Sequence, residues 1–443
     1  MSSPRDDRIA ELISSTASPM IGGPSDYDPL LELIGNSHLV LLGEASHGTH
    51  EFYCHRAQIT KRLITEKGFT AVAVEADWPD AYRVNTFVRG EGDDPDATEA
   101  LAGFQRFPAW MWRNADVLDF AGWLRSYNEH HVNKQAGFYG LDLYSLHTSI
   151  QAVLDYLDKV DPEAARRARY RYGCFEQFGE DTQAYGYAAS FGLSKTCEDE
   201  ALQQWLEMRR RAADLSHRDG RVMRDAFFFA EQNARLVKNA EEYYRSMFRG
   251  RISSWNLRDT HMADTLHALV QHLGRNSKCV VWAHNSHLGD ARATELGEHG
   301  ELNLGQLVRQ KYGDAAVLVG FSTYTGTVTA ASEWDGPAER KTVRPALPGS
   351  YEAIFHQAGI PSFVLRLKYN GELRSALHKP RLERAIGVIY RPQSERASHY
   401  FHARLPEQFD AILHIDETRA VEPLERAGEW EAGEVPETFP SAL

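Results

Sequence analysis

Two pairs of residues spaced three positions apart carry side chains suited to acid–base chemistry. Glu44 and His47 lie on a glycine-bounded turn, and His284 and His287 flank a second short turn. A carboxylate so close to an imidazole can hold the ring in one tautomer and raise its basicity. The first pair therefore predicts a general base, and the second predicts two imidazoles that face one point.

Further polar residues are candidates for the same site. Glu75 and Asp142 follow short apolar runs that predict strands. Arg56 falls about two turns into the helix predicted after the first pair, from where its guanidinium can reach an anionic group. Arg258 is placed at the start of a helix as a second contact for an anion or a transition state, and the adjacent Asp259 is interpreted as a helix cap.

An aromatic stretch, 107–113, predicts an apolar wall for a bulky ligand. Within it, Trp110 and Arg113 are the candidate substrate contacts. Tryptophans in such stretches are more commonly packed in the core, so core packing is the alternative interpretation.

Two chemistries suit carboxylates and imidazoles that converge without a nucleophilic Ser or Cys. In the first, His47 takes a proton from water while Glu44 orients the His47 ring. The oxyanion is then stabilised by His284, His287 and Arg56. In the second, a divalent metal supplies the hydroxide and is bound by Glu44, His47, Glu75, His284 and His287. Residue types alone do not separate the two, because a catalytic metal also takes about three to five such ligands.

Several familiar catalytic motifs do not occur in the sequence. There is no G-x-S-x-G elbow, no Gly-rich phosphate-binding loop and no H-E-x-x-H. These absences disfavour an α/β-hydrolase serine nucleophile, an NTPase, a dinucleotide-dependent enzyme and a zincin. Ser46 adjoins His47, but neighbours on a turn rarely pair as nucleophile and base, so Ser46 is interpreted as structural.

The elements that must position these residues follow an α/β pattern, in which short apolar runs alternate with helix-like segments. A helix is predicted at 50–67. Strands are predicted at 38–43, 70–74, 137–141 and 278–283, and later at 315–321, 363–367, 385–390 and 411–415. Candidate residues follow the ends of the first four strands, namely Glu44, Glu75, Asp142 and His284. Ligands bind at the carboxyl ends of strands in such sheets, so the site is expected there.

The fold expected is a mixed α/β core with a largely parallel central sheet flanked by helices and an inserted helical lobe that covers the active-site cleft. A change to long amphipathic helices predicts the lobe. The predicted parts are 1–195 for the first part of the core, 196–275 for the lobe, 276–425 for the second part of the core, and 426–443 for a flexible tail.

Composition narrows the class of protein. The chain of 443 residues has 49 basic and 62 acidic residues and a formal charge of −13, which disfavours a nucleic-acid binder. Four cysteines without C-x-x-C spacing argue against a disulfide framework or a structural zinc site. There is no signal-peptide pattern and no run of about 18 apolar residues. We therefore expect a cytoplasmic protein that acts on a small molecule, with no membrane partner.

Four blocks of the sequence together resemble the erythromycin esterase family. They are 42–48, Arg56, 74–75 and 282–287, in the family's order and at similar spacing, and the similarity runs from about 28 to 425. The resemblance implies a mixed α/β core, a helical lobe across the cleft, and hydrolysis of a macrolide lactone by activated water without an obligatory metal. It implies His47 as the general base, supported by Glu44, Arg56, Glu75, His284 and His287.

The same family includes relatives of unknown substrate, some linked to succinoglycan and other polysaccharide biosynthesis, and more distant relatives bind metal at comparable positions. Three hypotheses follow. The first is a hydrolase of an ester or macrolide lactone, an activity that gives antibiotic resistance and needs no cofactor. The second is a metal-dependent hydrolase with the same Glu/His cluster as ligands. The third is a non-catalytic accessory protein that binds a small molecule.

Overall fold

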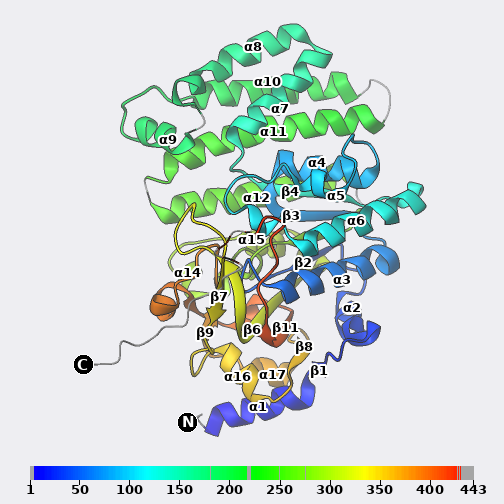
Figure 1. Ribbon diagram of the computed structural model, residues 1–443, viewed down its shortest axis with the longest axis vertical. Coiled ribbons are helices and arrows are strands. Elements are labelled where there is room, and N and C mark those ends of the chain that lie inside the picture. Colours follow the sequence, from blue (N-terminus) through cyan, green and yellow to red (C-terminus); the bar gives the residue numbers. More distant parts are fainter. Residues whose placement is uncertain are drawn as a thin grey trace.

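The structure, a computed structural model, describes residues 4–179, 181–216, 221–248, 250–274, 276–426, 428 and 430. A nine-stranded sheet runs along the long axis of the molecule in the order β1-β8-β11-β6-β2-β5-β3-β4, with β7 paired to β6 (Figure 1). Six neighbouring strands are parallel, namely β11 (Ala411–Thr418), β6 (Ala316–Ala330), β2 (Leu39–Leu42), β5 (Cys279–Trp282), β3 (Ala71–Asp77) and β4 (Gly137–Asp142). The remaining strands pair antiparallel, namely β1 (Ser18–Pro19), β8 (Ser362–Arg366) and β7 (Glu339–Val343). This largely parallel sheet confirms the predicted fold class.

Seven of the eight predicted strands are present, with ends shifted by a few residues and with β6 much longer than expected. The strand predicted at 385–390 is wrong. Its backbone bonds to two separate loops, through Ile386 N–H to Ala45 O and through Tyr390 N–H to Ala331 O, and so joins no ladder. A short strand, β9 (Arg381–Arg384), precedes it and pairs with β10 (Tyr400–Ala403) in a separate two-stranded sheet.

Successive residues of the central strands face opposite sides of the sheet, as the pleat requires. Leu39 and Leu41 of β2 belong to one buried cluster, while Val40 and Leu42 belong to the other. One face is covered by α3 (His50–Lys67), α4 (Trp78–Arg89) and α6 (Ala115–His130), and the other by α12 (Arg251–Leu273), α15 (Leu304–Tyr312) and α16 (Tyr351–Gln357). Helix α3 has the predicted bounds and ends at Gly68, whose φ of 70° favours glycine.

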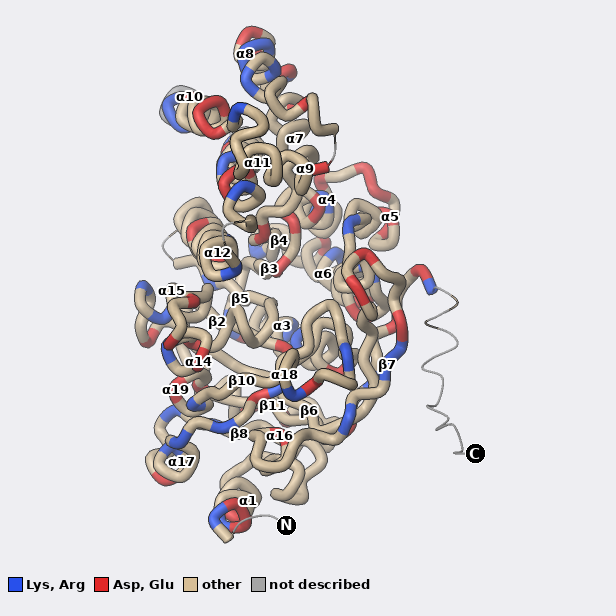
Figure 2. Tube along the Cα trace, turned by 90° about the vertical axis from the view of Figure 1, so that its left-hand side faces the viewer, with Lys and Arg blue, Asp and Glu red and all other residues tan. Residues whose placement is uncertain are grey.

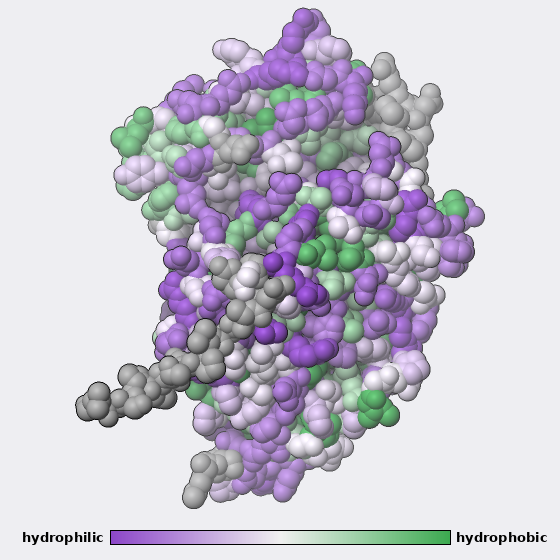
Figure 3. Space-filling view, in the orientation of Figure 1, coloured by the Kyte–Doolittle hydropathy of each residue, from purple (hydrophilic) through white to green (hydrophobic). Residues whose placement is uncertain are grey.

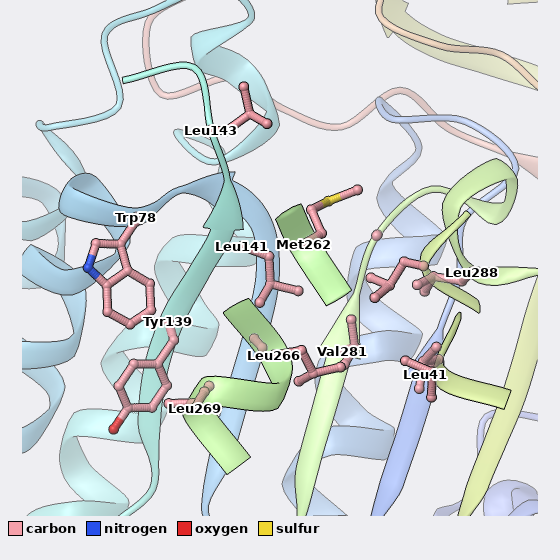
Figure 4. Packing of buried hydrophobic residues seen from close by; sticks show 14 of the residues in the cluster. Leu41, Trp78, Tyr139, Leu141, Leu143, Met262, Leu266, Leu269, Val281 and Leu288 are labelled. Atoms are coloured by element: carbon pink, nitrogen blue, oxygen red, sulfur yellow. The ribbon is translucent and has the colours of Figure 1, made fainter. Parts of the chain in front are cut away.

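Helix α12 matters most for the site because it lies directly on the strands that carry it. Met262, Leu266 and Leu269 are fully buried. They pack beside Leu41 of β2, Val281 of β5 and Leu141 of β4 (Figure 4). Burial of each such side chain contributes about 1.5–3 kcal/mol, so this contact fixes α12 on the sheet.

The helices beyond the β4 edge form a layer of their own (Figure 1). They are α7 (Leu146–Val160), α8 (Pro162–Tyr172), α9 (Thr182–Ser190), α10 (Glu198–Ser216) and α11 (Arg221–Ser246). This layer begins at Leu146, whereas the sequence pattern predicts the start of the helical lobe at residue 196. Its outer helices carry acidic and basic residues side by side (Figure 2), including an Arg171–Glu207 pair at 2.6 Å between α8 and α10. Such surface pairs contribute only about 0–1 kcal/mol each.

A disulfide between Cys174 and Cys197, with Cα atoms 5.9 Å apart, corrects the expectation of a protein without disulfides. The two cysteines are 23 residues apart in sequence, and the turn around α9 brings them together. Spacing rules detect only short cysteine motifs, so this pair left no sequence signal. Cys54 and Cys279 are free.

The remaining α-helices of the described residues are α1 (Pro4–Thr16), α2 (Asp28–Ile34), α5 (Ala97–Leu101), α13 (Asn285–Leu288), α14 (Glu295–Glu298), α17 (Gly371–Ala376), α18 (Glu395–Ser398) and α19 (Leu405–Gln408). Most of the tail predicted at 426–443 lies outside the described residues. Within its described part, Trp430 is buried and donates a hydrogen bond of 2.8 Å to Thr329 Oγ1. In the described part of the chain, no helix is both long and apolar enough to cross a bilayer.

The surface seen in Figure 3 is largely hydrophilic, and hydrophobic residues show at its edge beside α9. Phe191 and Leu193, just after that helix, are 60% and 69% exposed.

Candidate active site

A cavity of about 450 Å³ opens at the carboxyl ends of the parallel strands. The register explains why the candidate residues meet there: Trp282 of β5 lies opposite both Leu42 of β2 and Val74 of β3. Residues at or just after the ends of these three strands therefore emerge at one edge, and Glu75 lies within β3, which runs to Asp77 beyond the predicted end. The predicted site residues that line the cavity are His47, Glu75, Asp142, Arg258, His284 and His287.

Glu44 lies behind the cavity wall and holds His47 in place. Its Oε1 is 2.9 Å from His47 Nδ1, and its Oε2 forms an ion pair of 2.7 Å with Arg56 Nη2. An ionised Glu44 accepts the Nδ1–H of His47, which leaves the Nε2 lone pair as the free acceptor of a ring that lines the cavity. Backbone contacts fix the same turn, since Tyr53 Oη donates to His47 O at 2.8 Å.

The turn after His47 requires glycine. A Cβ on Gly48 would lie 1.8 Å from Thr329 O, so no side chain fits between the turn and β6. The glycine-bounded turn noted in the sequence is thus a close approach of two backbones.

Arg56 does not contact the cavity, which corrects its predicted role as a contact for an oxyanion. Its guanidinium is fully buried against the faces of Tyr53 and Trp282, with Cζ 4.4 and 5.2 Å from the ring centroids. Its nitrogens have no hydrogen-bond partner among the described residues, and the Glu44 carboxylate is its ion-pair partner there. Arg56 therefore acts on Glu44, as its counterion.

His284 lines the cavity, and the partners of its Nδ1 decide which ring nitrogen carries the proton. Its Nδ1 accepts the backbone N–H of Ser286 at 3.3 Å and lies 2.8 Å from Ser286 Oγ. A neutral ring with Nδ1 as acceptor carries its proton on Nε2. That nitrogen is buried and has no partner among the described residues. Burial lowers the pKa of His284 well below 6.5, and neighbouring His47 acts in the same direction.

His47 and His284 are adjacent, with ring centroids 4.7 Å apart. One ring offers a proton acceptor and the other a proton donor. This is the arrangement needed to activate a water molecule on one side and to polarise a carbonyl oxygen on the other.

Glu75 is held as a carboxylate beside these rings. Its Oε2 accepts the backbone N–H of His284 at 2.8 Å, and its Oε1 lies 2.7 Å from Arg258 Nη2 and 3.2 Å from His287 Nε2. Burial raises the pKa of a carboxyl, but His287 and Arg258 outweigh burial and hold the pKa of Glu75 well below its ordinary value.

Arg258 links two carboxylates at the floor of the cavity. It bonds Asp142 twice, from Nε at 2.9 Å and from Nη2 at 2.6 Å, in addition to its contact with Glu75. Arg258 lies in the interior of α12 and not at the start of a helix, because α12 already begins at Arg251. Its charge is thus committed to Asp142 and Glu75.

Asp259 is the residue whose role the sequence interpretation missed. Asp259 was predicted to cap its helix, but it does not. It is fully buried, with both carboxylate oxygens 2.9 Å from His287 Nδ1. Burial lowers the pKa of His287, and the carboxylates of Asp259 and Glu75 outweigh burial and raise it to about 9. No spacing rule connects residues 28 positions apart, so only the folded chain reveals this pair.

The remaining walls of the cavity combine apolar and charged groups. The rings of Phe107 and Trp334 pack edge to face, with their centroids 5.1 Å apart. Phe107 comes from the loop after α5, and Trp334 from the β6–β7 turn. Asp77 is bound by Arg106 Nε and Nη2 at 3.1 and 3.0 Å. Burial and the nearby Asp77 raise the pKa of Asp80 to about 7. Sequence reasoning singled out none of these charged residues.

Two predicted substrate contacts lie away from the cavity. Trp110 is buried, and Arg113 pairs with Glu425. The neighbouring side chains Ala109, Met111 and Trp112 line the cavity instead. The aromatic stretch does provide an apolar wall, but a 3₁₀ turn at Ala109–Met111 decides which side chains face it.

The five residues considered as metal ligands do not form a ligand set in this arrangement. Within the described residues, no group of three or more His, Cys, Asp or Glu side chains has a geometry that would hold a metal ion. The Glu44 and Glu75 carboxylates already face arginines, and both ring nitrogens of His287 face protein partners. The donor chemistry therefore suits a network of ion pairs.

Comparisons with known proteins agree with this fold. The sequence model of the erythromycin esterase family matches residues 64–418. The chain is 22% identical to the erythromycin esterase type II of Escherichia coli, covering 90% of this chain and 93% of that protein. It is 21% identical to the putative hydrolase YbfO of Bacillus subtilis (strain 168), covering 87% of this chain and 85% of that protein.

Solved structures share the same fold. A Bacillus cereus protein has a TM-score of 0.80 at 22% identity, covering 95% of this chain and 99% of that chain. A succinoglycan biosynthesis protein has a TM-score of 0.76 at 24% identity, covering 95% and 100%. A mutant of the erythromycin esterase EreC in its open conformation has a TM-score of 0.67 at 16% identity, covering 93% and 99%. The chain belongs to the erythromycin esterase family, and this membership supports a hydrolase.

Proposed function

We propose that this protein hydrolyses an ester or lactone bond with a water molecule activated by His47. One observation carries the proposal: His47 and His284 line a single cavity with ring centroids 4.7 Å apart, and the partners of their Nδ1 atoms leave a proton acceptor on one ring and a donor on the other. A base for water and a donor for the carbonyl oxygen are the two groups that ester hydrolysis requires.

The reaction proceeds in two steps. His47 Nε2 takes a proton from water as the water oxygen bonds to the carbonyl carbon, and the resulting oxyanion accepts the Nε2–H of His284. The C–O bond to the leaving group then breaks, and the protonated His47 returns its proton to the leaving alkoxide, which gives a carboxylic acid and an alcohol. Glu44 stabilises the positive charge that His47 carries between the two steps, through the 2.9 Å contact to Nδ1.

A macrolide lactone is the proposed substrate class, because relatives of similar sequence and fold carry the name erythromycin esterase. The cavity of about 450 Å³ is within the range of about 300–1,000 Å³ found for small-molecule sites. Phe107 and Trp334 offer an apolar surface to the bulky part of such a molecule. Opening of the lactone would inactivate the antibiotic.

The test is hydrolysis of erythromycin and of a panel of simple esters in ¹⁸O-labelled water, followed by mass spectrometry. We expect one ¹⁸O atom in the carboxylate product, no loss of activity with a chelator, and loss of turnover in His47→Ala with the fold retained. Retained turnover in His47→Ala would remove His47 from its role. Loss of turnover with chelator, restored by a metal, would favour the metal-dependent hydrolase.

A binding protein without catalysis predicts a different pattern. Calorimetric titration would then show tight macrolide binding, while the intact protein leaves the lactone closed under all conditions tested. His47→Ala separates the two cases, since it removes hydrolysis in an enzyme but changes only affinity in a binding protein.

A further inference from the structure

A second carboxylate–imidazole pair lies next to the first and takes no part in the steps above. Asp259 is fully buried on α12, and its two oxygens are both 2.9 Å from His287 Nδ1. His287 is 2% exposed and borders the cavity. Burying two charged groups carries a desolvation penalty that apolar side chains of similar size avoid. A purely structural role at this place would therefore be served better by apolar side chains.

Three further contacts fix the orientation of the His287 ring. The ring of Trp255 stacks on it with centroids 4.5 Å apart and planes 9° apart. Trp255 Nε1 in turn donates to Leu302 O at 2.9 Å. Asp259 Oδ1 accepts the backbone N–H of Leu304 at 2.8 Å, at the first residue of α15. The imidazole is thus held from α12 and from the start of α15, and its Nε2 has a single direction.

That direction leads to Glu75 and to Arg258. Nε2 lies 3.2 Å from Glu75 Oε1 and 3.0 Å from Arg258 Nη1. A protonated Nε2 can donate only to the carboxylate, and an unprotonated Nε2 can only accept from the guanidinium. The two contacts therefore require opposite protonation states, and the carboxylate of Asp259 on Nδ1 favours the charged ring.

We propose that Asp259 is a positioning residue for the hydrolysis: it holds His287 as an imidazolium that donates from Nε2 to Glu75, and so fixes the Glu75 carboxylate next to His284. The inference rests on the proposed function for its catalytic meaning. Glu75 Oε2 accepts the backbone N–H of His284 at 2.8 Å, so the chain of contacts ends on the residue that faces the carbonyl oxygen. The negative charge of Glu75 also favours the positive charge that His47 acquires.

Charged and titratable groups reach His287 from four directions. They are Arg258 and Asp259 from α12, Glu75 from β3, His284 from its own turn, and Glu301 from the segment between α14 and α15. Arg258 opposes a positive charge on His287, while Asp259 and Glu75 favour it, and these two carboxylates prevail. Loss of the Asp259 charge removes one of the two.

The first experiment needs no substrate. Nitrogen-15 and proton spectra of the histidine rings in the full-length protein, assigned with His287→Gln, report which ring nitrogens of His287 carry protons. We expect both nitrogens to be protonated until about pH 9, as for the raised pKa of His287. In Asp259→Asn we expect the titration midpoint to fall by about one unit or more. An unprotonated Nε2 at neutral pH in the unmodified protein, or an unchanged midpoint in Asp259→Asn, would overturn the proposal.

The second experiment measures turnover of an ester that the unmodified protein hydrolyses. Asp259→Asn retains an oxygen for Leu304 N–H, so the fold should persist, and kcat should fall about 10- to 100-fold with little change in KM. Asp259→Glu should recover part of the loss. Asp264→Asn is the matched control, since Asp264 is exposed on the same helix. A purely structural role predicts a lower thermal midpoint with an unmoved His287 titration.

The two proposals fail in distinguishable ways. If the unmodified protein hydrolyses no ester, the proposed function fails, and the ring titration still decides whether Asp259 controls His287. If hydrolysis occurs and kcat is unaffected in a folded Asp259→Asn, the positioning role is wrong and the hydrolase stands. Should Asp259→Asn not fold, the spectrum of the unmodified protein and the titration of Asp259→Glu decide.

Discussion

The pair of Glu44 and Arg56 allows stability and catalysis to be separated in one set of variants. Arg56 is fully buried, and Glu44 is its counterion at 2.7 Å. Glu44→Gln leaves the guanidinium charge in the core beside the faces of Tyr53 and Trp282, without its carboxylate partner. Breaking a buried ion pair on one side costs about 3–5 kcal/mol, and the aromatic faces place the expected loss toward the lower value.

The double variant Glu44→Gln with Arg56→Met removes both charges. Replacement of a complete buried pair by uncharged groups is often close to neutral, so we expect its unfolding free energy to return to within about 1–2 kcal/mol of the unmodified protein. Activity should not return, because His47 has lost the carboxylate that fixes its tautomer. By analogy with other carboxylate–histidine pairs, kcat should remain about 100- to 10,000-fold low.

Urea denaturation followed by circular dichroism gives the stability of the two variants and of the unmodified protein, and lactone or ester hydrolysis gives kcat. The surface substitution Glu66→Gln on the same helix is the control for loss of a carboxylate, since Glu66 is exposed. A Glu44→Gln protein as stable as the original would refute the description of Arg56 as a buried charge with one counterion. A double variant with full activity would refute the role of Glu44 in holding His47.

Three further predictions concern the cavity. His284→Leu removes the donor to the oxyanion and should lower kcat about 100- to 1,000-fold with KM nearly unchanged, so a rise in KM alone would contradict the assignment. Ser286→Ala should reduce kcat less than tenfold, because it only loosens the His284 ring. If Ser286→Ala abolishes turnover and mass spectrometry finds an acyl-enzyme in the unmodified protein, Ser286 is a nucleophile instead. Asp80 has a pKa raised to about 7 by burial and Asp77, so the folded chain keeps a proton that the unfolded chain releases from about pH 4 upward. Stability due to this group therefore falls as the pH rises from about 4 to 7, and Asp80→Asn should raise the urea midpoint more at about pH 8 than at about pH 5; equal shifts at both would show that Asp80 does not titrate in this window.

Much of the site could be predicted because strand ends are visible in the sequence. Glu44, Glu75 and His284 follow short apolar runs, and parallel strands bring the residues that follow them to one edge. The spacing of Glu44 and His47 also indicated their contact, because a short turn determines the distance between them. These features depend on local sequence and on one general property of α/β sheets.

The contributions of α12 could not be predicted in the same way. Asp259 reaches His287, and Arg258 reaches Asp142 across 116 positions, only because α12 docks on β4 and β5. Likewise, Arg56 points into the core and not toward the cavity because of how α3 is rotated on the sheet. The strand predicted at 385–390 was wrong for a related reason. Its backbone N–H groups bond to loops that only the folded chain brings near.

The position of β5 has a consequence for synthesis of the chain. β5 lies between β2 and β3, although it follows them by about 200 residues along the chain. During translation, which proceeds from the N-terminus, β3 soon pairs with β4 and keeps one unpaired edge, whereas both neighbours of β2, namely β5 and β6, emerge later. Unpaired strand edges are the places where chains associate wrongly, so the nascent protein is vulnerable at these edges until β5 and then β6 have left the ribosome. The strand that lies between β2 and β3 also delivers His284, so the site cannot form before β5 has joined the sheet.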